Sequence, residues 1–361
     1  MSTIVELQVT AVRNIDQARL DCHPHLNIVY GRNGSGKTSL LEAIYLLARG
    51  KSFRTASTDT VIGKQHQESV VHARLVDHQL GISRSRGDKR KLQLDERSQP
   101  NWDEVARALP VLILDSGSFS LLDGGPGARR QYLDWGVFHV EQTFLPAWRR
   151  YRRALANRNQ LLKHHNPDDQ ELAAWDVELD SAADTIDQCR RAYSEALKPV
   201  LLGLFAEIAG SSTADDCTVE YQRGWTEDMS LAEVLLRNRG IDIRYKSTQS
   251  GPQRADLVIK IGTRPAAEVL SRGQQKMLVS AMKIAQGKAY TSSLGRECIY
   301  LVDDLPAELD THNRAQVLEC LGALGSQLFV TSVEARAIQS ASDGLKDYSA
   351  FHVERGKITS G

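Results

Sequence analysis

The sequence contains few cysteines and no long apolar segment. Its five cysteines are scattered, with no two at metal-ligand spacing: Cys22, Cys189, Cys217, Cys298 and Cys320. In a chain of this length, that pattern is typical of reduced, buried thiols in a cytosolic protein. No run approaches the ~20 apolar residues of a membrane-spanning helix. The N-terminus also lacks the basic and then apolar layout of a signal peptide, so we expect a cytoplasmic protein with no membrane partner.

Neither sign of charge dominates the chain. Lysine plus arginine and aspartate plus glutamate each number 45, so the net charge argues neither for nor against a nucleic-acid partner. Hydrophobic residues make up 41% and charged residues 25%, which are ordinary values for a globular protein. The sequence shows no internal repeat and no low-complexity tract. Any nucleic-acid site must therefore be sought in local basic patches.

Strand-like and helix-like patterns occur in separate blocks. Short β-like runs fill residues 4–30, a hairpin pattern covers 70–85, and the apolar run Val111–Leu114 predicts a buried strand. Helix-period segments dominate from about residue 127 to 240, and strand patterns return after residue 252. These blocks predict an α/β fold, in which a domain built from residues 1–120 and 245–361 is interrupted by a mostly helical insertion at residues 121–244. The helices predicted in the insertion include Phe144–Lys163, Glu171–Glu195 and Leu197–Ile208.

A glycine-rich segment follows the apolar run Leu26–Tyr30, fits the pattern G-x-x-x-x-G-K-[ST] and opens a helical pattern that Gly50 stops. Its glycines allow backbone N–H groups to converge on phosphate oxygens, and the helix dipole adds positive potential. Lys37 would reach the β- and γ-phosphates of a nucleotide, and the Thr38 hydroxyl would ligate Mg²⁺. The alternative is a glycine-rich turn that matches by chance, which the strand–loop–helix context disfavours. The predicted nucleotide-binding residues of this loop are Gly31, Asn33, Gly34, Ser35, Gly36, Lys37, Thr38 and Ser39.

Two carboxylates, Asp303 and Asp304, end the apolar run at residues 298–302. At the carboxyl end of a strand beside a phosphate loop, Asp303 would hold Mg²⁺ directly or through water, and Asp304 would orient or deprotonate the attacking water. The alternative is a strand that meets a polar turn. We therefore predict Lys37, Asp303 and Asp304 as catalytic residues, and Thr38 and Asp303 as metal ligands.

A second anion site is predicted at the segment Leu270-Ser271-Arg272-Gly273-Gln274. It stands directly before a helical pattern, and the N-terminus of a helix attracts anions. Two such sites in one chain suggest a γ-phosphate held from two sides, whereas an ordinary serine helix cap is the alternative. The apolar residues of the helical pattern are Met277, Leu278, Ala281, Ile284 and Ala285.

The order of these motifs, completed by Ala307-Glu308-Leu309-Asp310, resembles that of ABC ATPases. The resemblance implies a P-loop head with a mixed sheet that binds ATP and Mg²⁺. It also implies that the nucleotide sites are completed when two copies meet head to tail. In that arrangement Ser271, Gly273 and Gln274 contact the partner's nucleotide, and Asp310 lies at the interface.

Further stretches resemble one subfamily, the RecF recombination-repair ATPases, over nearly the whole chain. The most specific of them lies in the predicted insertion, where Gly124-Gly125-Pro126 is followed by Arg129-Arg130 and Leu133-Asp134-Trp135. That family is related to SMC and Rad50 ATPases but lacks their long coiled coils, as this chain does. The other matching stretches are Val12–Ile15, Gly36–Tyr45, Lys51–Arg54, Ser271–Gln274 and Leu301–Asp310.

Two departures from the ABC pattern bear on the hydrolysis rate. The last core strand ends in Thr331-Ser332, where these ATPases usually carry a histidine, and the sequence leaves open whether either residue replaces it. The glutamine expected after the strand at 111–114 is also not evident, because Asp115-Ser116 stands there. We therefore expect slow hydrolysis that times a clamp rather than driving a fast motor.

Two basic patches are candidates for DNA contact. Residues 142–167 contain no acidic residue and carry six cations, among them Arg158, which suits a phosphate backbone. Three arginines, at 149, 152 and 153, share one helix face. The second patch surrounds the early hairpin. Exposed loops and solvated or acid-paired helix faces are the alternatives. The candidate DNA-binding residues are Arg149, Arg150, Arg152, Arg153, Arg84 and Arg86.

The resemblance to the RecF family implies a weak, DNA-stimulated ATPase of DNA damage repair, the SOS response and replication-fork maintenance. ATP would draw two chains together on duplex DNA near single-strand junctions, and hydrolysis would release them. RecR and RecO would be partners in loading recombinase. The main alternative is the ATPase subunit of an ABC membrane transporter, which shares the core motifs. An SMC-like clamp is disfavoured because no long heptad region exists.

Overall fold

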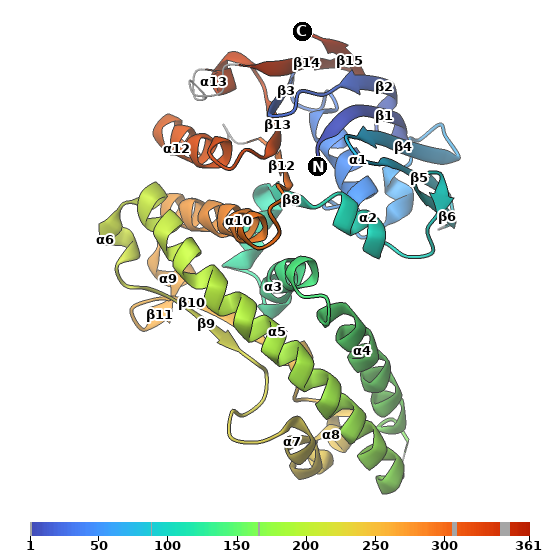
Figure 1. Cartoon of the computed structure of the whole chain (residues 1–361), viewed down its shortest axis with the longest axis vertical. Coiled ribbons are helices and arrows are strands. Elements are labelled where there is room, and N and C mark those ends of the chain that lie inside the picture. The colour runs from blue at the N-terminus through green and yellow to red at the C-terminus, as the bar shows by residue number, and fades with distance from the viewer. Residues whose placement is uncertain (1, 88, 165–166, 305–308, 340–346) are drawn as a thin grey trace. The chain divides into compact units, whose positions relative to one another are not determined.

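The computed structural model describes residues 2–87, 89–164, 167–304, 309–339 and 347–361, and the statements below concern these residues. The chain forms two compact units (Figure 1). The first unit comprises Met1–Phe119, Glu207–Ala209 and Arg272–Gly361, and the second comprises Ser120–Ala206 and Gly210–Ser271. The first predicted boundary, at residue 120, lies next to the start of the second unit.

The second predicted boundary differs from the one in the structure. We expected the first domain to resume at residue 245, whereas the first unit resumes at Arg272. The reason is a small sheet inside the second unit, where β10 (Asp256–Ile261) pairs antiparallel with β9 (Cys217–Gln222) and with β11 (Arg264–Pro265). Because of this pairing, the strand-like residues between the predicted boundary at 245 and the observed one at 272 belong to the insertion.

A mixed sheet of six strands forms the centre of the first unit, in the order β15-β14-β3-β13-β12-β8. Its pairs are parallel except for the antiparallel hairpin β14–β15. Parallel strands place their carboxyl ends at one edge, so the residues that follow β3, β13, β12 and β8 gather there. The strands are β3 (Leu26–Tyr30), β8 (Val111–Leu114), β12 (Ile299–Val302), β13 (Gln327–Ser332), β14 (Tyr348–Glu354) and β15 (Lys357–Ser360).

An antiparallel sheet in the order β2-β1-β4-β5-β6-β7 is the other sheet of this unit. The hairpin predicted at residues 70–85 is confirmed as β4–β5. Helix α1 (Lys37–Arg49) places Leu40, Leu41 and Ile44 in one apolar core with side chains from both sheets. The strands are β1 (Ile4–Val12), β2 (Ile15–Asp21), β4 (Glu68–Leu75), β5 (Gln79–Ser85), β6 (Lys89–Leu94) and β7 (Arg97–Ser98).

The remaining helices of the first unit include α10 (Arg272–Leu294), which has the apolar face predicted from its sequence. All five predicted positions, from Met277 to Ala285, are buried. The helix α1 ends at Gly50 as predicted, since Gly50 has a left-handed φ of 66° and its N–H donates to the Leu46 carbonyl at 2.8 Å. The other helical segments are η1 (Thr58–Val61), α2 (Asp103–Ala108), α12 (Thr311–Gly322) and α13 (Arg336–Gln339), with η2 (Ser116–Leu121) spanning both units.

The second unit is mostly helical. Two predicted helices, Glu171–Glu195 and Leu197–Ile208, are one continuous helix, α5 (Asp169–Ala209), which contains Pro199. None of the described helices is both long enough and apolar enough to cross a membrane. The other helical segments are α3 (Pro126–Val140), α4 (Phe144–Leu161), α6 (Ser211–Ala214), α7 (Leu231–Arg237), α8 (Arg239–Tyr245), η3 (Pro252–Arg254) and α9 (Ala266–Val269).

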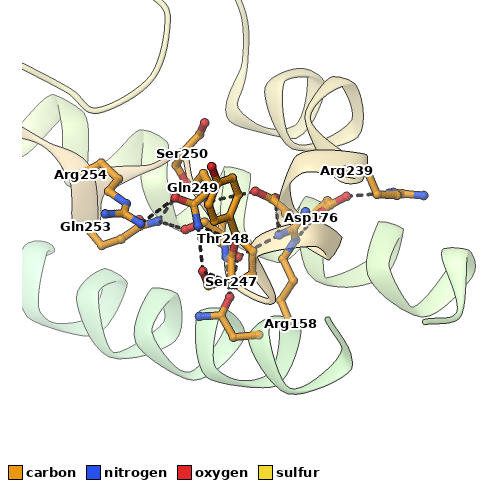
Figure 2. A network of polar contacts seen from close by, with 12 residues as sticks. Arg158, Asp176, Arg239, Ser247, Thr248, Gln249, Ser250, Gln253 and Arg254 are labelled. Atoms are coloured by element: carbon orange, nitrogen blue, oxygen red, sulfur yellow. Dashed lines mark hydrogen bonds and ion pairs between the residues drawn. The ribbon is translucent and has the colours of Figure 1, made fainter. Parts of the chain in front are cut away.

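A buried ionic network joins α4, α5 and α8 (Figure 2). Arg158, which has no exposed surface, donates to Asp176 at 2.6 Å, to Asp242 at 2.7 Å and to Thr248 at 2.8 Å. Arg239 donates to the second oxygen of Asp176 at 3.0 Å. The prediction that Arg158 is one of the cations available to a phosphate backbone was therefore wrong, because Arg158 lies on the buried face of α4.

Candidate functional site

The phosphate-loop pattern lies between β3 and α1, as predicted. Position 31 requires glycine for two reasons. A Cβ atom there would lie 2.2 Å from the Val353 carbonyl oxygen, and the φ angle of Gly31 is 150°. Gly36 also has a positive φ, 124°, and precedes α1 as its N-cap without a side-chain cap. The backbone therefore turns tightly at both ends of the loop and leaves the first N–H groups of α1 available to an anion.

Lys37 lies across this loop. Its ammonium group donates to the carbonyl oxygens of Gly31 at 2.7 Å and Arg32 at 3.1 Å. Burial lowers the pKa of Lys37, while the negative charges of Asp304 and Asp303 act in the opposite direction. The loop, the lysine and the two carboxylates thus form one electrostatic site in the first unit.

A hydrogen-bonded cluster connects the phosphate loop to the ends of β12 and β13. The Asp303 Oδ1 atom accepts hydrogen bonds from the hydroxyls of Thr38 at 3.0 Å and Thr331 at 2.8 Å. Thr331 also accepts from the backbone N–H of Asp304 at 2.8 Å. Burial raises the pKa of Asp303 above its usual value, although the bonds from Thr331 and Thr38 oppose this shift.

The donor set at this cluster suits Mg²⁺. Hydroxyl and carboxylate oxygens are hard ligands, and Mg²⁺ is ordinarily held by one or two of them together with water and phosphate oxygens. Thr38 and Asp303 converge at 3.0 Å, which places both candidate ligands at one point. Among the described residues no group of three or more His, Cys, Asp or Glu side chains could hold a metal. The remaining ligands of a metal here would be water and phosphate oxygens.

Sequence reasoning gave Thr331 no definite role. Its hydroxyl is completely buried and is engaged with Asp303 and the backbone of Asp304, whereas the Ser332 hydroxyl donates to the Glu334 carbonyl at 2.8 Å. Thr331 therefore connects the Asp303 carboxylate to the backbone of Asp304. The only sequence signal for it was its place at the end of the last core strand.

The residues around Asn14 support the phosphate loop, and we identified them only through family resemblance. Asn14 donates to the Ser35 carbonyl at 3.0 Å and accepts from the Ser39 hydroxyl at 2.8 Å. Arg13 makes a bidentate pair with the buried carboxylate of Glu42, at 2.8 and 2.7 Å. Arg13 thus forms a structural ion pair with Glu42 of α1.

The second predicted anion site, Leu270–Gln274, which we call the signature segment, lies at the start of α10. Ser271 and Gly273 are exposed, and Gln274 is partly exposed. A Cβ atom on Gly273 would meet nothing within 4 Å, so the surface beside it is open. The Ser271–Arg272 bond is also the boundary between the two units, so Leu270 and Ser271 belong to the second unit, and Arg272, Gly273 and Gln274 belong to the first.

Asp310, the predicted interface residue, is the N-cap of α12. Its carboxylate accepts from the Asn313 backbone N–H at 2.9 Å and the Asn313 side chain at 2.7 Å, and these contacts lower its pKa. Asp310 is itself exposed. Ala307 and Glu308, named with it in the sequence pattern, lie outside the described residues.

The arginines of the two basic patches differ in their exposure and in their hydrogen-bond partners. Arg149, Arg150, Arg152 and Arg153 are all exposed on α4, and Arg150 pairs with Glu178 on α5 at 2.7 Å. Arg86 donates to the His66 carbonyl at 3.1 Å. Another member of the hairpin patch, Arg84, is only 5% exposed and donates to the Gly50 carbonyl at the end of α1. Arg84 therefore holds β5 to α1, and we leave it out of any DNA-facing surface.

Comparison with known proteins gives consistent matches over the whole chain. A family model described as RecF/RecN/SMC N terminal domain matches residues 3–359. A Pseudomonas aeruginosa (strain LESB58) protein named DNA replication and repair protein RecF is 44% identical over 364 residues, 99% of this chain and 97% of the relative. An Azotobacter vinelandii protein of the same name is 44% identical over 356 residues, 97% of this chain and 96% of the relative.

Solved structures show the same fold. One described as the recombination mediator protein RecF-ATP in the RecFOR pathway has a TM-score of 0.87 at 24% identity and covers 99% of this chain and 97% of its own. An Smc head bound to the C-winged helix domain of ScpA has a TM-score of 0.59 at 15% identity and covers 99% of this chain and 97% of its own. The predicted fold class, an ABC-ATPase-like P-loop head with a mixed sheet and a mostly helical insertion, is thereby confirmed.

Proposed function

Because the chain belongs to the family of RecF DNA replication and repair proteins, within the wider RecF/RecN/SMC group, we propose that it is a DNA-binding ATPase of replication and repair. The observation that carries the proposal is the 3.0 Å hydrogen bond from Thr38 to Asp303, which joins the phosphate loop to β12 across 265 residues. A direct test measures phosphate release from ATP with and without Mg²⁺ and duplex DNA. Release that never exceeds the blank would contradict the proposal.

In the proposed reaction, each group of the cluster has a separate task. The loop N–H groups and Lys37 hold the β- and γ-phosphates, and Thr38 and Asp303 would hold Mg²⁺. The metal would neutralise charge on the phosphate oxygens. Asp304, held by its backbone bond to Thr331, orients or deprotonates the attacking water. The remaining predicted nucleotide contacts are Gly31, Asn33, Gly34, Ser35, Gly36 and Ser39.

We further propose that the sites are completed by a second copy of the chain. Ser271, Gly273 and Gln274 would contact the γ-phosphate bound by the partner, and Asp310 would lie at the same interface. The exposure of Ser271 and Gly273 and the open space beside Gly273 support this role. ATP would then drive dimerisation, and hydrolysis would reverse it.

Replacing Ser271 with glutamate should prevent this dimer while sparing nucleotide binding by the monomer. A carboxylate opposite the γ-phosphate would add like-charge repulsion, so ATP-dependent dimerisation should weaken at least about tenfold. The measurements are particle mass with and without ATP and, separately, ATP affinity at low protein concentration. The matched control is Ser293→Glu, which changes an exposed serine near the end of α10, the helix that follows Ser271. Loss of ATP binding by the Ser271 variant in its monomeric form would instead place the serine in its own chain's site.

We propose that DNA contacts α4 through its exposed arginines. The exposed arginines Arg149, Arg152 and Arg153 form the core of this surface, and Arg150, which pairs with Glu178, lies beside them. Such side chains contact phosphates and carry no base readout, so binding should be tolerant of sequence. Arg86, on the hairpin of the other unit, is a further candidate.

Replacing both Arg152 and Arg153 with alanine should weaken DNA binding and make it less dependent on salt concentration. Each phosphate contact contributes about 0.9 to the slope of log K against log salt, so losing both contacts should flatten that slope by roughly two. The measurement is a salt titration of binding to gapped duplex DNA. Arg150→Ala is the control and should change the slope less. An unchanged slope in the double variant would remove α4 from the DNA surface.

The wider role is proposed by family. The similar ATP-bound structure is described as part of the RecFOR pathway. We propose that this chain acts with RecR and RecO in the cytoplasm, at single-strand junctions in duplex DNA, to help load recombinase. None of the similar proteins described above is named as a transporter, and the transporter alternative has no observation in its favour.

A further inference from the structure

A small cavity lies beside Asp303 in the first unit. Its volume is about 20 Å³, which is room for one water molecule. Four polar side chains line it, together with apolar ones: Asp115, Lys276, Ser280 and Asp303. Neither Asp115 nor Lys276 has a place in the proposed chemistry. Their position beside Asp303 is therefore unexplained by the proposed function.

Asp115 reaches this cavity through strand register. Leu114 is the register partner of Val302 in the parallel pair β8–β12, and the Asp303 N–H donates to the Leu114 carbonyl at 2.9 Å. The next residues, Asp115 and Asp303, thus leave the sheet side by side. The Ser118 hydroxyl donates to Asp115 Oδ1 at 2.7 Å, which fixes the carboxylate at the start of η2.

Lys276 reaches the same cavity from α10. Lys276, Val279 and Ser280 all line it and have the spacing of one helix face. Lys283, one further turn along that face, is also electrostatically coupled to Asp115. Burial lowers the pKa of Lys283 to about 8, and Asp115 acts to raise it. Asp115 therefore lies near two lysines of α10: Lys276, which lines the same cavity, and Lys283.

We propose that Asp115 and Lys276 are positioning residues that connect the signature helix α10 to the magnesium-binding carboxylate Asp303. Their opposite charges line the cavity beside Asp303 and set the electrostatic field in which Asp303, and a water beside it, act in hydrolysis. Lys276 lies within the first two turns of α10, so one helix carries both the residues proposed to contact a partner's nucleotide and a side chain that lines the cavity beside Asp303. The inference rests on the proposed ATPase function and deepens it, because it relates one chain's signature to that chain's own site.

The test removes the charge of Asp115 and keeps its shape. Asp115→Asn retains an acceptor for Ser118 and should lower kcat for ATP hydrolysis by about tenfold or more, because preorganised charge is lost, while KM and ATP affinity stay within about twofold. Lys276→Gln should also lower kcat. If the two residues act as a pair, the double variant should be no slower than the slower single variant. Glu104→Gln, an exposed carboxylate on α2, is the control for net charge.

Three outcomes would overturn the inference. They are an unchanged kcat in Asp115→Asn, independent and additive effects of the two substitutions, and a loss of ATP affinity in Asp115→Asn as large as its loss of kcat, which would assign the effect to nucleotide binding. The proposed function is tested separately with Lys37→Met and Asp303→Asn. If those variants hydrolyse ATP like the unmodified chain, the proposed function fails. If they lose hydrolysis and Asp115→Asn does not, only this inference fails.

Discussion

Replacing Lys37 with methionine should lower ATP hydrolysis by about 100- to 1,000-fold, because it removes one preorganised donor to the transferred phosphoryl group. Methionine keeps the length and most of the volume of the lysine stem. The side chain is 7% exposed, so the substitution leaves an apolar chain in a buried position and should not unfold the protein. The measurements are steady-state phosphate release and equilibrium ATP affinity.

The comparison with Lys37→Arg separates charge from geometry. Arginine keeps the charge, but its planar guanidinium cannot replace a compact ammonium that donates to two loop carbonyls, at Gly31 and Arg32. It should therefore also weaken the nucleotide switch. Lys64→Met, at an exposed position, is the matched control. Hydrolysis within threefold of the unmodified chain in Lys37→Met would place the phosphates elsewhere, given the size of such effects.

Replacing Arg158 with methionine should destabilise the second unit by about 3–5 kcal/mol, the usual result of leaving a buried charge without its partner. Asp242 is 0% exposed and would lose its ion pair, and Thr248 would lose a donor. Asp176 would keep only Arg239. The measurement is urea unfolding of the whole chain, monitored by a spectroscopic signal from the second unit.

The same helix provides the control for this effect. Arg150→Ala removes an exposed pair with Glu178, and exposed pairs contribute about 0.2–1 kcal/mol. Both substitutions delete an arginine of α4, so the difference between them reports burial rather than helix propensity. A loss below about 1 kcal/mol in Arg158→Met would contradict a large contribution of the buried pair to stability.

Local patterns predicted the elements that hold the nucleotide site. The phosphate loop, the apolar strand before Asp303 and the helix after Ser271 are each encoded within about twenty residues, where periodicity and glycine placement are informative. The second boundary was misplaced because β10 pairs with a strand far away in the sequence.

The side-chain partnerships could not be predicted in the same way. Thr331 bonds to Asp303, and Glu42 pairs with Arg13, only because sheet order brings distant segments together. Arg158 and Arg84 have the residue type of a surface cation, yet each is buried on the inner face of its element. An arginine in an acid-free helix segment indicates a DNA surface only if its face of the helix is known.

The backbone at Asp304 also restricts which acid can stand there. Its φ is 54°, in the left-handed region that aspartate and asparagine enter more readily than most other residues. The usual cost of that conformation is about 1–2 kcal/mol, and a short polar side chain that bonds locally reduces it. Glutamate would carry its carboxylate one methylene further out and gain no such local relief. Position 304 thus requires a residue that tolerates a left-handed backbone and also supplies a carboxylate to a water, and aspartate satisfies both requirements.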